Sequence, residues 1–175
     1  MTRIVSKGME GVCESRQFFP KLNRHPVPAH GCCLMKPMTR INSNLSPKQL
    51  TRVHLVAELR EITMVPAALR RSLRTKSVDD VINSIPAKFT LNVGHVKFFY
   101  NKLEFLKNRF SSLADEMDNR GFNPDRKRVA AFDGFDPIWY NDWESDPTDD
   151  ALVIDRINLR IAQKPHLYKD KILTT

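Results

Sequence analysis

The fold is decided by one stretch near the middle of the chain, residues 94–121, which reads GHVKFFYNKLEFLKNRFSSLADEMDNRG. Its apolar residues recur in steps of three and four, which places them on one face of an α-helix. Gly121 stands where the pattern stops, and glycine often ends a helix because it tolerates left-handed backbone conformations. We therefore predict a helix from about Gly94 to Arg120. Its apolar face comprises Val96, Phe99, Leu103, Leu106, Phe110, Leu113 and Met117.

A second helix is predicted upstream of this stretch. The sequence Ser46-Pro47-Lys48-Gln49 offers a serine that can cap, a proline suited to the first helical position and a glutamine that completes a capping box. Apolar residues at Leu55, Leu59 and Ile62 then continue at helical spacing. Pro66 should kink this helix or restart it, because proline cannot donate a backbone hydrogen bond.

A third helix is predicted after Pro147, with Thr148 as its N-cap and the acidic pair Asp149-Asp150 favouring its first turn. It should stop before Pro165. We expect an all-α fold, a compact single domain of about three main helices with long connecting loops. The loop before the third helix holds aromatic residues that should cover the core, namely Trp139, Tyr140 and Trp143.

Charge is distributed unevenly along the chain. Residues 132–150 hold seven acidic residues and no lysine or arginine, which leaves 28 basic against 13 acidic residues elsewhere. The overall net charge of +8 therefore understates how basic most of the protein is. Such a balance is typical of proteins with polyanionic partners, a group that includes ribosomal, membrane-surface and nucleic-acid-binding proteins.

Residues 1–37 differ from the rest of the chain, because they hold all three cysteines and four of the eleven prolines and show no sustained period. We expect a poorly ordered extension, or one absent from the mature protein, before a domain spanning residues 38–175. Cys13, Cys32 and Cys33 lack a zinc-finger spacing, so no metal site is expected. No apolar run is long enough for a membrane span or a secretory signal, so we expect a soluble, intracellular protein.

Thr39 could carry chemistry if it were the first residue of the mature protein. Methionine before a small residue is readily removed, so a start at Met38, or cleavage there, would expose the Thr39 α-amine. A reference pKa of about 8 for such an amine leaves a nucleophilic fraction at pH 7, which cationic neighbours such as Arg40 and Arg60 would enlarge. In the chain as written this nitrogen is an amide, and the alternative is an ordinary linker residue.

Glu61 lies on the predicted upstream helix, on one stripe with His54 and Glu58. Neighbouring carboxylates repel each other, which favours proton retention and suits general acid–base chemistry. The alternative is a solvated surface residue, as glutamates on amphipathic helices usually are.

Basic residues recur on all three predicted helices and could form one phosphate-binding face. The alternative is that they are separate solvated charges. Phe98, Phe99 and Tyr100 could stack on bases, but their helical spacing is more typical of a core. The basic residues are Arg60, Arg70, Arg71, Arg74, Lys97, Lys102, Lys107, Arg156 and Arg160.

Several short motifs come one after another in a fixed order between Met38 and Lys169. They are Met38-Thr39-Arg40-Ile41-Asn42, His54 to Glu61, Phe89-Thr90-Leu91, Gly94 to Tyr100, Lys102 to Leu106, Arg120 to Asn123 and Ile161 to Pro165. In combination they resemble the pyrimidine dimer DNA glycosylases of the phage endonuclease V type. The resemblance implies the all-α fold of that family and an activity on DNA.

By this resemblance, Thr39 would attack the anomeric carbon of the 5′ nucleotide of a cyclobutane dimer, and Glu61 would transfer protons. The resulting Schiff base would undergo β-elimination and nick the strand, with no metal or organic cofactor. The implied partner is double-stranded DNA containing UV photoproducts, bent sharply and bound by a monomer, with a base expelled opposite the lesion. The residues expected to contact DNA are Arg40, His54, Arg60, Arg71, Arg156, Arg160 and Tyr168.

Three features depart from the phage enzyme. Met64 replaces an arginine, which should weaken one phosphate contact, and Leu167 stands where the phage enzyme has a tryptophan. The residues before Met38 would block the nucleophile. The alternative function is therefore a non-enzymatic DNA-binding protein, and a structural nucleic-acid or virion component is a third possibility.

Overall fold

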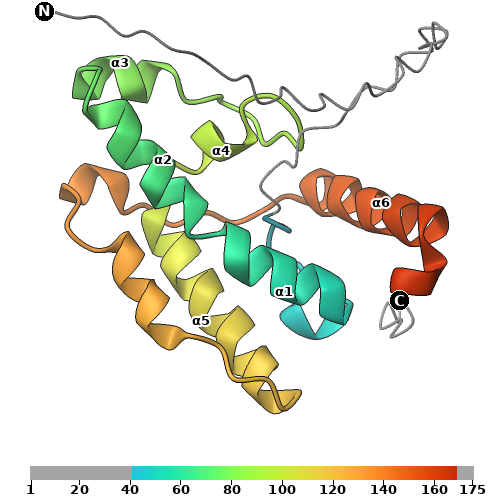
Figure 1. The fold of residues 1–175 in the computed structure, drawn as a ribbon. Helices are drawn as coiled ribbons and strands as arrows, with labels where there is room; N and C mark the ends of the chain where they lie inside the picture. The colour runs from blue at the N-terminus through green and yellow to red at the C-terminus, as the bar shows by residue number, and fades with distance from the viewer. Residues whose placement is uncertain (1–40, 169–175) are drawn as a thin grey trace, which may run out of the picture. The chain divides into compact units, whose positions relative to one another are not determined.

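The computed structural model describes residues 41–168, which belong to one compact unit. Within that range the chain forms helices and loops and no β-strand, which confirms the expected all-α fold. The predicted extension 1–37 with its cysteines, and also Thr39 and Arg40, lie outside the described residues. The elements in chain order are η1 Pro47–Gln49, α1 Arg52–Glu61, α2 Met64–Leu73, α3 Val78–Asn83, α4 His95–Phe98, α5 Leu103–Asn119, η2 Arg126–Phe132, η3 Pro137–Trp139, α6 Pro147–Gln163 and η4 Pro165–Leu167, where η marks a 3-10 helix (Figure 1).

Helix α5 supplies much of the core. It lies beside α1 and also packs against η1 and η2, while α2 contacts α1, α3 and α4 (Figure 1). Leu103, Leu106 and Leu113 on α5 are fully shielded from solvent. Burying such side chains stabilises the fold by about 2 kcal/mol each. The apolar face predicted for this region is confirmed, since each of its residues except the partly buried Val96 lies in the core.

The single helix predicted from Gly94 to Arg120 is wrong in its first part, where the chain forms the short α4, a turn and then α5. The three consecutive aromatic residues 98–100 are each at most 5% exposed. In a continuous helix they would point in directions about 100° apart, so one face could not bury them all. The break lets Phe99 stack on Phe105 while Phe98 packs edge-on against Trp143. Their expected place in the core is confirmed.

The predicted end of that helix is confirmed. Gly121 has a positive φ of 77°, in the left-handed region that glycine tolerates. Its N–H donates to the carbonyl of Asp118, and the next N–H, that of Phe122, donates to the carbonyl of Met117. These two bonds form a Schellman motif, which satisfies carbonyls at the helix end.

The predicted start of the upstream helix is wrong by one turn. Ser46 makes no side-chain capping bond, and residues 47–49 form only the 3-10 helix η1. Leu50 is fully buried with an extended backbone, so the helix cannot run through it. Thr51 is the true cap, because its Oγ1 accepts from the His54 N–H at 3.4 Å. The helix then stops at Glu61 and restarts as α2, with Pro66 as its third residue.

Helix α6 begins at the predicted place but with a different cap. The carboxylate of Asp146, not Thr148, accepts from the N–H groups of Thr148 and Asp149, at 2.8 and 2.9 Å. The hydrogen bond from the Thr148 hydroxyl, followed by these backbone bonds, holds the pKa of Asp146 below its usual value. The helix ends at Gln163, before Pro165 as predicted.

The long segment between α5 and α6 covers the core, as expected. Trp139 is 1% exposed, and the Tyr140 hydroxyl donates to the carbonyl of Phe132 at 2.6 Å. Trp143 packs among the aromatic rings around Phe99. Across residues 41–168 we find no helix with the length and apolar character that a bilayer span requires.

Candidate active site

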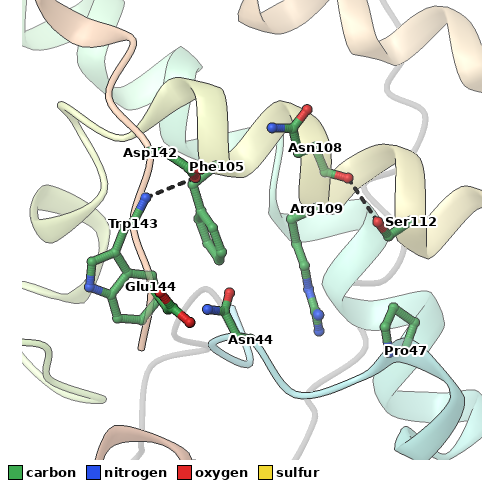
Figure 2. Close-up of a pocket in the computed structure, with 9 residues that line it drawn as sticks. All are labelled: Asn44, Pro47, Phe105, Asn108, Arg109, Ser112, Asp142, Trp143 and Glu144. Carbon is green, nitrogen blue, oxygen red and sulfur yellow. Dashed lines mark hydrogen bonds between the residues drawn. The ribbon is translucent and has the colours of Figure 1, made fainter. Parts of the chain in front are cut away.

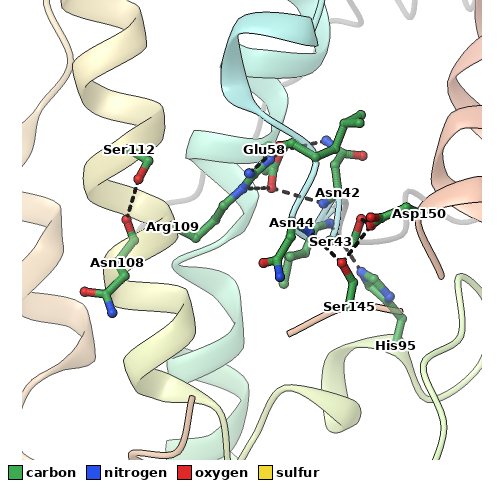
Figure 3. A network of polar contacts seen from close by, with 12 residues as sticks. Asn42, Ser43, Asn44, Glu58, His95, Asn108, Arg109, Ser112, Ser145 and Asp150 are labelled. Atoms are coloured by element: carbon green, nitrogen blue, oxygen red, sulfur yellow. Dashed lines mark hydrogen bonds and ion pairs between the residues drawn. The ribbon is translucent and has the colours of Figure 1, made fainter. Parts of the chain in front are cut away.

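Five consecutive residues, Ile41 to Leu45, are each hydrogen-bonded to other parts of the fold, and we call them the anchored segment (Figure 3). The segment begins two residues after Thr39. All but Asn44 are buried, and Ser43 has a positive φ of 47°, which is uncommon for a residue with a side chain. Its position is therefore set by side chains that come from several helices.

Glu58 of α1 is the centre of these contacts. Its two carboxylate oxygens accept from the Asn42 N–H at 3.0 Å and from the Asn42 side-chain amide at 2.6 Å. The guanidinium of Arg109, on α5, donates to the same two oxygens at 2.9 and 3.1 Å. The side chains of Glu58 and Arg109 are 0% and 5% exposed, so they form a buried, bidentate ion pair in which both carboxylate oxygens are satisfied. Arg109 also donates to the carbonyl of Leu45 at 2.5 Å.

His95, the first residue of α4, holds the segment from another side. Its Nδ1 lies 2.6 Å from the carbonyl of Thr90, which can only accept, so Nδ1 carries the proton. The unprotonated Nε2 then accepts from the Ile41 N–H at 3.3 Å. Burial lowers the pKa of His95 to about 4, although the bond to Thr90 opposes the shift. The imidazole is therefore neutral at pH 7, as its role as an acceptor requires.

Helix α6 contributes two further contacts. Arg156 donates to the side-chain oxygen of Asn42 at 2.5 Å. Asp150 accepts from the Ser43 hydroxyl at 2.6 Å and from the Ser145 hydroxyl at 2.7 Å. The anchored segment thus joins α1, α4, α5 and α6, which are remote from one another in sequence.

The structure gives the predicted site residues different surroundings. Glu61 ends α1 and is half-buried, three residues beyond Glu58. The expected repulsion between these two carboxylates is countered at Glu58, because Arg109 already pairs with that group. Thr39 and Arg40 precede the described part of the chain.

Predicted DNA-contacting arginines lie on three helices. Arg60 on α1 and Arg71 on α2 are exposed, whereas Arg156 and Arg160 lie one turn apart on α6 and are half-buried. The structure brings Arg156 to the anchored segment, where it bonds to Asn42. Direct DNA contact by all four arginines stays a prediction.

His54 and Tyr168, both predicted to contact DNA, stack on each other with ring centroids 4.8 Å apart. Both are buried, and His54 Nδ1 lies 2.8 Å from the hydroxyl of Thr51. The stack ties the residue after η4 to the start of α1. Their contact with DNA stays a prediction beside this packing role.

Three residues of the possible phosphate-binding face make contacts within the fold. Arg70 donates to the carbonyls of Ala131 and Asp133 at 2.8 and 2.6 Å. Lys102 donates to the carbonyl of Phe98 at 2.9 Å, and burial lowers the pKa of this amine. Lys107 pairs with Asp133 at 3.0 Å. These three cations therefore already have partners within the protein, and a single phosphate-binding face stays a prediction.

A surface pocket of about 400 Å³ lies beside Arg109, between α5 and the segment before α6 (Figure 2). Its walls include the rings of Phe105 and Trp143, and its lining also includes the carboxylates of Asp142 and Glu144. A polyanion would be repelled by these carboxylates, and Arg109 is already paired. The lining of this pocket therefore does not favour a DNA phosphate.

Residues 38–129 match the family described as pyrimidine dimer DNA glycosylase. The match covers more than half of the chain, including Thr39, Glu61 and the contacts made by Glu58, His95 and Arg109. The resemblance in sequence, the helical fold and this match together show that the chain belongs to the pyrimidine dimer DNA glycosylase family, whose members act on DNA in repair.

Proposed function

We propose that this protein excises cyclobutane pyrimidine dimers with the α-amine of Thr39 as nucleophile and Glu61 as the proton-transfer group. The amine attacks the anomeric carbon of the 5′ nucleotide, and the bond from that carbon to the base breaks as the base takes up a proton. The sugar then opens to a Schiff base with Thr39. Removal of a 2′ proton expels the 3′ phosphate by β-elimination, which nicks the strand.

The observation that carries this proposal is the anchored segment next to α1. Asn42 lies three residues after Thr39 and is hydrogen-bonded to Glu58, and Glu61 lies three residues further along the same helix. Three extended residues span about 10 Å, and three helical residues advance about 4.5 Å. The chain is therefore long enough to bring the Thr39 nitrogen beside Glu61.

Arginines on neighbouring helices support binding to double-stranded DNA that contains UV photoproducts. Arg60 and Arg71 are exposed, and Arg156 and Arg160 share one face of α6. Guanidinium groups suit phosphate oxygens because they donate two parallel hydrogen bonds. Unstacking at a dimer costs less than at intact pairs, so the lesion itself favours the distorted complex. A monomer suffices for this arrangement.

A protein that starts at Thr39 provides the test. Mixed with irradiated duplex DNA and borohydride, it is expected to form a covalent adduct, because borohydride reduces a Schiff base to a stable amine. Without borohydride it should nick the DNA at dimers. The same protein with its α-amine acetylated serves as the control and should give neither product. Failure of the free-amine form to give either product would overturn the proposal.

The second candidate function is a DNA-binding protein without enzymatic activity. It is favoured by one observation, that the chain as written places residues before Thr39, so its nitrogen is an amide. The 175-residue protein should not nick under either function, because its Thr39 nitrogen is blocked, so the two functions are distinguished by how this protein binds. Equal affinity for damaged and undamaged duplex, with a steep dependence on salt, would support the second candidate, whereas preference for damaged duplex would support the repair enzyme.

A further inference from the structure

Each residue of the anchored segment is hydrogen-bonded to a part of the fold that is distant in sequence. The five residues bond to side chains from α1, α4, α5, α6 and the turn before α6. A buried ion pair such as Glu58–Arg109 adds little net stability, because removing two charges from water costs free energy and apolar residues of similar volume often stabilise a fold as well. Such a network is better explained by a need to fix one arrangement of the chain.

Two of the bonds hold the main chain itself. The Ile41 N–H donates to His95, and the next N–H, that of Asn42, donates to Glu58. His95 and Glu58 belong to different helices, so the backbone is held from two elements at once. Each acceptor is oriented by a further partner, Thr90 for His95 and Arg109 for Glu58.

The backbone at Ser43 adds an independent observation. Its φ of 47° lies in the left-handed region, and its hydroxyl is fixed by Asp150. Unfavourable backbone conformations persist only where the surroundings impose them, and they gather at functional sites. A requirement on the path of the residues just before Ser43 explains this turn.

We propose that His95 and Glu58 are positioning residues, which fix the backbone immediately after Thr39 so that its α-amine is held at the reacting carbon. This inference rests on the proposed function. Neither residue touches DNA in this scheme, and both act through the main chain of Ile41 and Asn42. The two glutamates of α1 then divide the work, with Glu58 holding the nucleophile and Glu61 moving protons.

The test compares variants at His95 in protein that starts at Thr39. His95→Phe keeps a flat ring among Phe89 and Phe99 but removes the acceptor for the Ile41 N–H. Gln in the same position retains a carbonyl oxygen that can accept this bond. Misplacing a nucleophile by about 1 Å can slow a reaction by about a hundredfold. We therefore expect His95→Phe to lower the single-turnover rate of borohydride trapping about tenfold to a hundredfold, and His95→Gln to recover most of that loss.

Two further measurements separate positioning from damage to the fold or the amine. DNA binding by His95→Phe should change less than about twofold, because no DNA contact is removed. Its Thr39 amine should react with free formaldehyde and borohydride at the unaltered rate, because that reaction needs no alignment. Val81→Ala, a core change in α3, is the control for lost stability and should trap normally.

His95→Leu provides a second variant if His95→Phe does not fold. It also removes the acceptor for the Ile41 N–H, and it should likewise slow trapping without weakening DNA binding. Trapping at the unaltered rate by a folded His95→Phe or His95→Leu protein would overturn the inference alone. An equal loss of trapping rate in His95→Gln and His95→Phe would also overturn it. A comparable loss of trapping rate in Val81→Ala would do the same. If the unaltered protein forms no adduct, the proposed function fails and the inference with it.

Discussion

Two glutamates three residues apart on α1 differ in their surroundings. Glu58 is 0% exposed, and its oxygens accept hydrogen bonds from Asn42 and Arg109. Glu61 is half-buried at the end of the helix. A carboxylate whose oxygens already serve a bidentate cation is poorly placed to exchange protons with a substrate. The acid–base role therefore falls to Glu61 in the proposed mechanism.

Replacing Glu61 by glutamine tests this role. Glu61→Gln is expected to slow strand nicking by about 10²-fold to 10⁴-fold, because general acid–base catalysis contributes that much. DNA binding should change little. Single-turnover nicking and a binding titration measure the two effects. Glu104→Gln, an exposed carboxylate on α5, is the control and should nick normally. Equal activity of the Glu61 and Glu104 variants would exclude Glu61 as the proton-transfer group.

Removing Arg109 should destabilise the protein strongly. Arg109→Met leaves Glu58 buried without its cation, at a cost of about 3–5 kcal/mol in the free energy of unfolding. Urea unfolding measures the loss. Arg126→Met, which breaks exposed pairs with Asp115 and Asp118, should cost much less. A comparable loss in the two variants would show that burial of the Glu58–Arg109 pair is not what makes it important.

His95 makes stability depend on pH. Its pKa is about 4 in the folded protein against an ordinary 6.5, so the unfolded chain takes up the proton first as pH falls. As pH falls from 6.5 to 4, this difference lowers the free energy of unfolding by about 3 kcal/mol, and above pH 6.5 it lowers it no further. Urea unfolding across this range should show a shallower decline for His95→Gln than for the unaltered protein. Parallel declines would contradict a buried, neutral His95.

The buried role of Arg109 could have been read from the sequence. It lies three residues after Leu106 and four before Leu113, so it falls on the apolar face of the predicted helix. A charge on such a face must be paired. The partner could not be predicted, because Glu58 is 51 residues away and only the packing of α1 on α5 brings it near.

At the scale of elements, the sequence predicts where helices end better than where they begin. Gly121 and Pro165 act locally, since each disfavours helix in its own backbone. The predicted start of α1 and the predicted cap of α6 were wrong because several residues can cap, and tertiary packing selects among them. Burial of Leu50 in an extended conformation moves the start of α1 from Ser46 to Thr51. Burial of three adjacent aromatic rings likewise divides α4 from α5.

The start of α1 can be tested with two matched cap variants. Thr51→Ala should lower the free energy of unfolding by about 1 kcal/mol, because it removes the acceptor for the His54 N–H. Ser46→Ala should have almost no effect, since Ser46 makes no capping bond. Thermal or urea unfolding of the two variants measures these losses and shows which residue caps α1. A larger loss at Ser46 than at Thr51 would support the start predicted from sequence.

For the whole molecule, the uneven charge predicts how DNA binding responds to salt. The logarithm of the binding constant falls linearly with the logarithm of the salt concentration, with a slope proportional to the number of phosphates contacted. Arg71→Gln and Arg160→Gln should each reduce the slope of log K against log salt by about one unit. Arg70→Gln should leave the slope unchanged, because Arg70 holds the carbonyls of Ala131 and Asp133. Equal slopes for all three variants would contradict the proposed DNA face.

The central claim is that a main-chain nitrogen, held by buried side chains beside α1, performs the chemistry. It is tested most directly by mass spectrometry of the peptide that carries the reduced DNA adduct, using protein that starts at Thr39. The account predicts that the DNA remnant is attached to the α-nitrogen of Thr39. Attachment to the side-chain nitrogen of a lysine would contradict it.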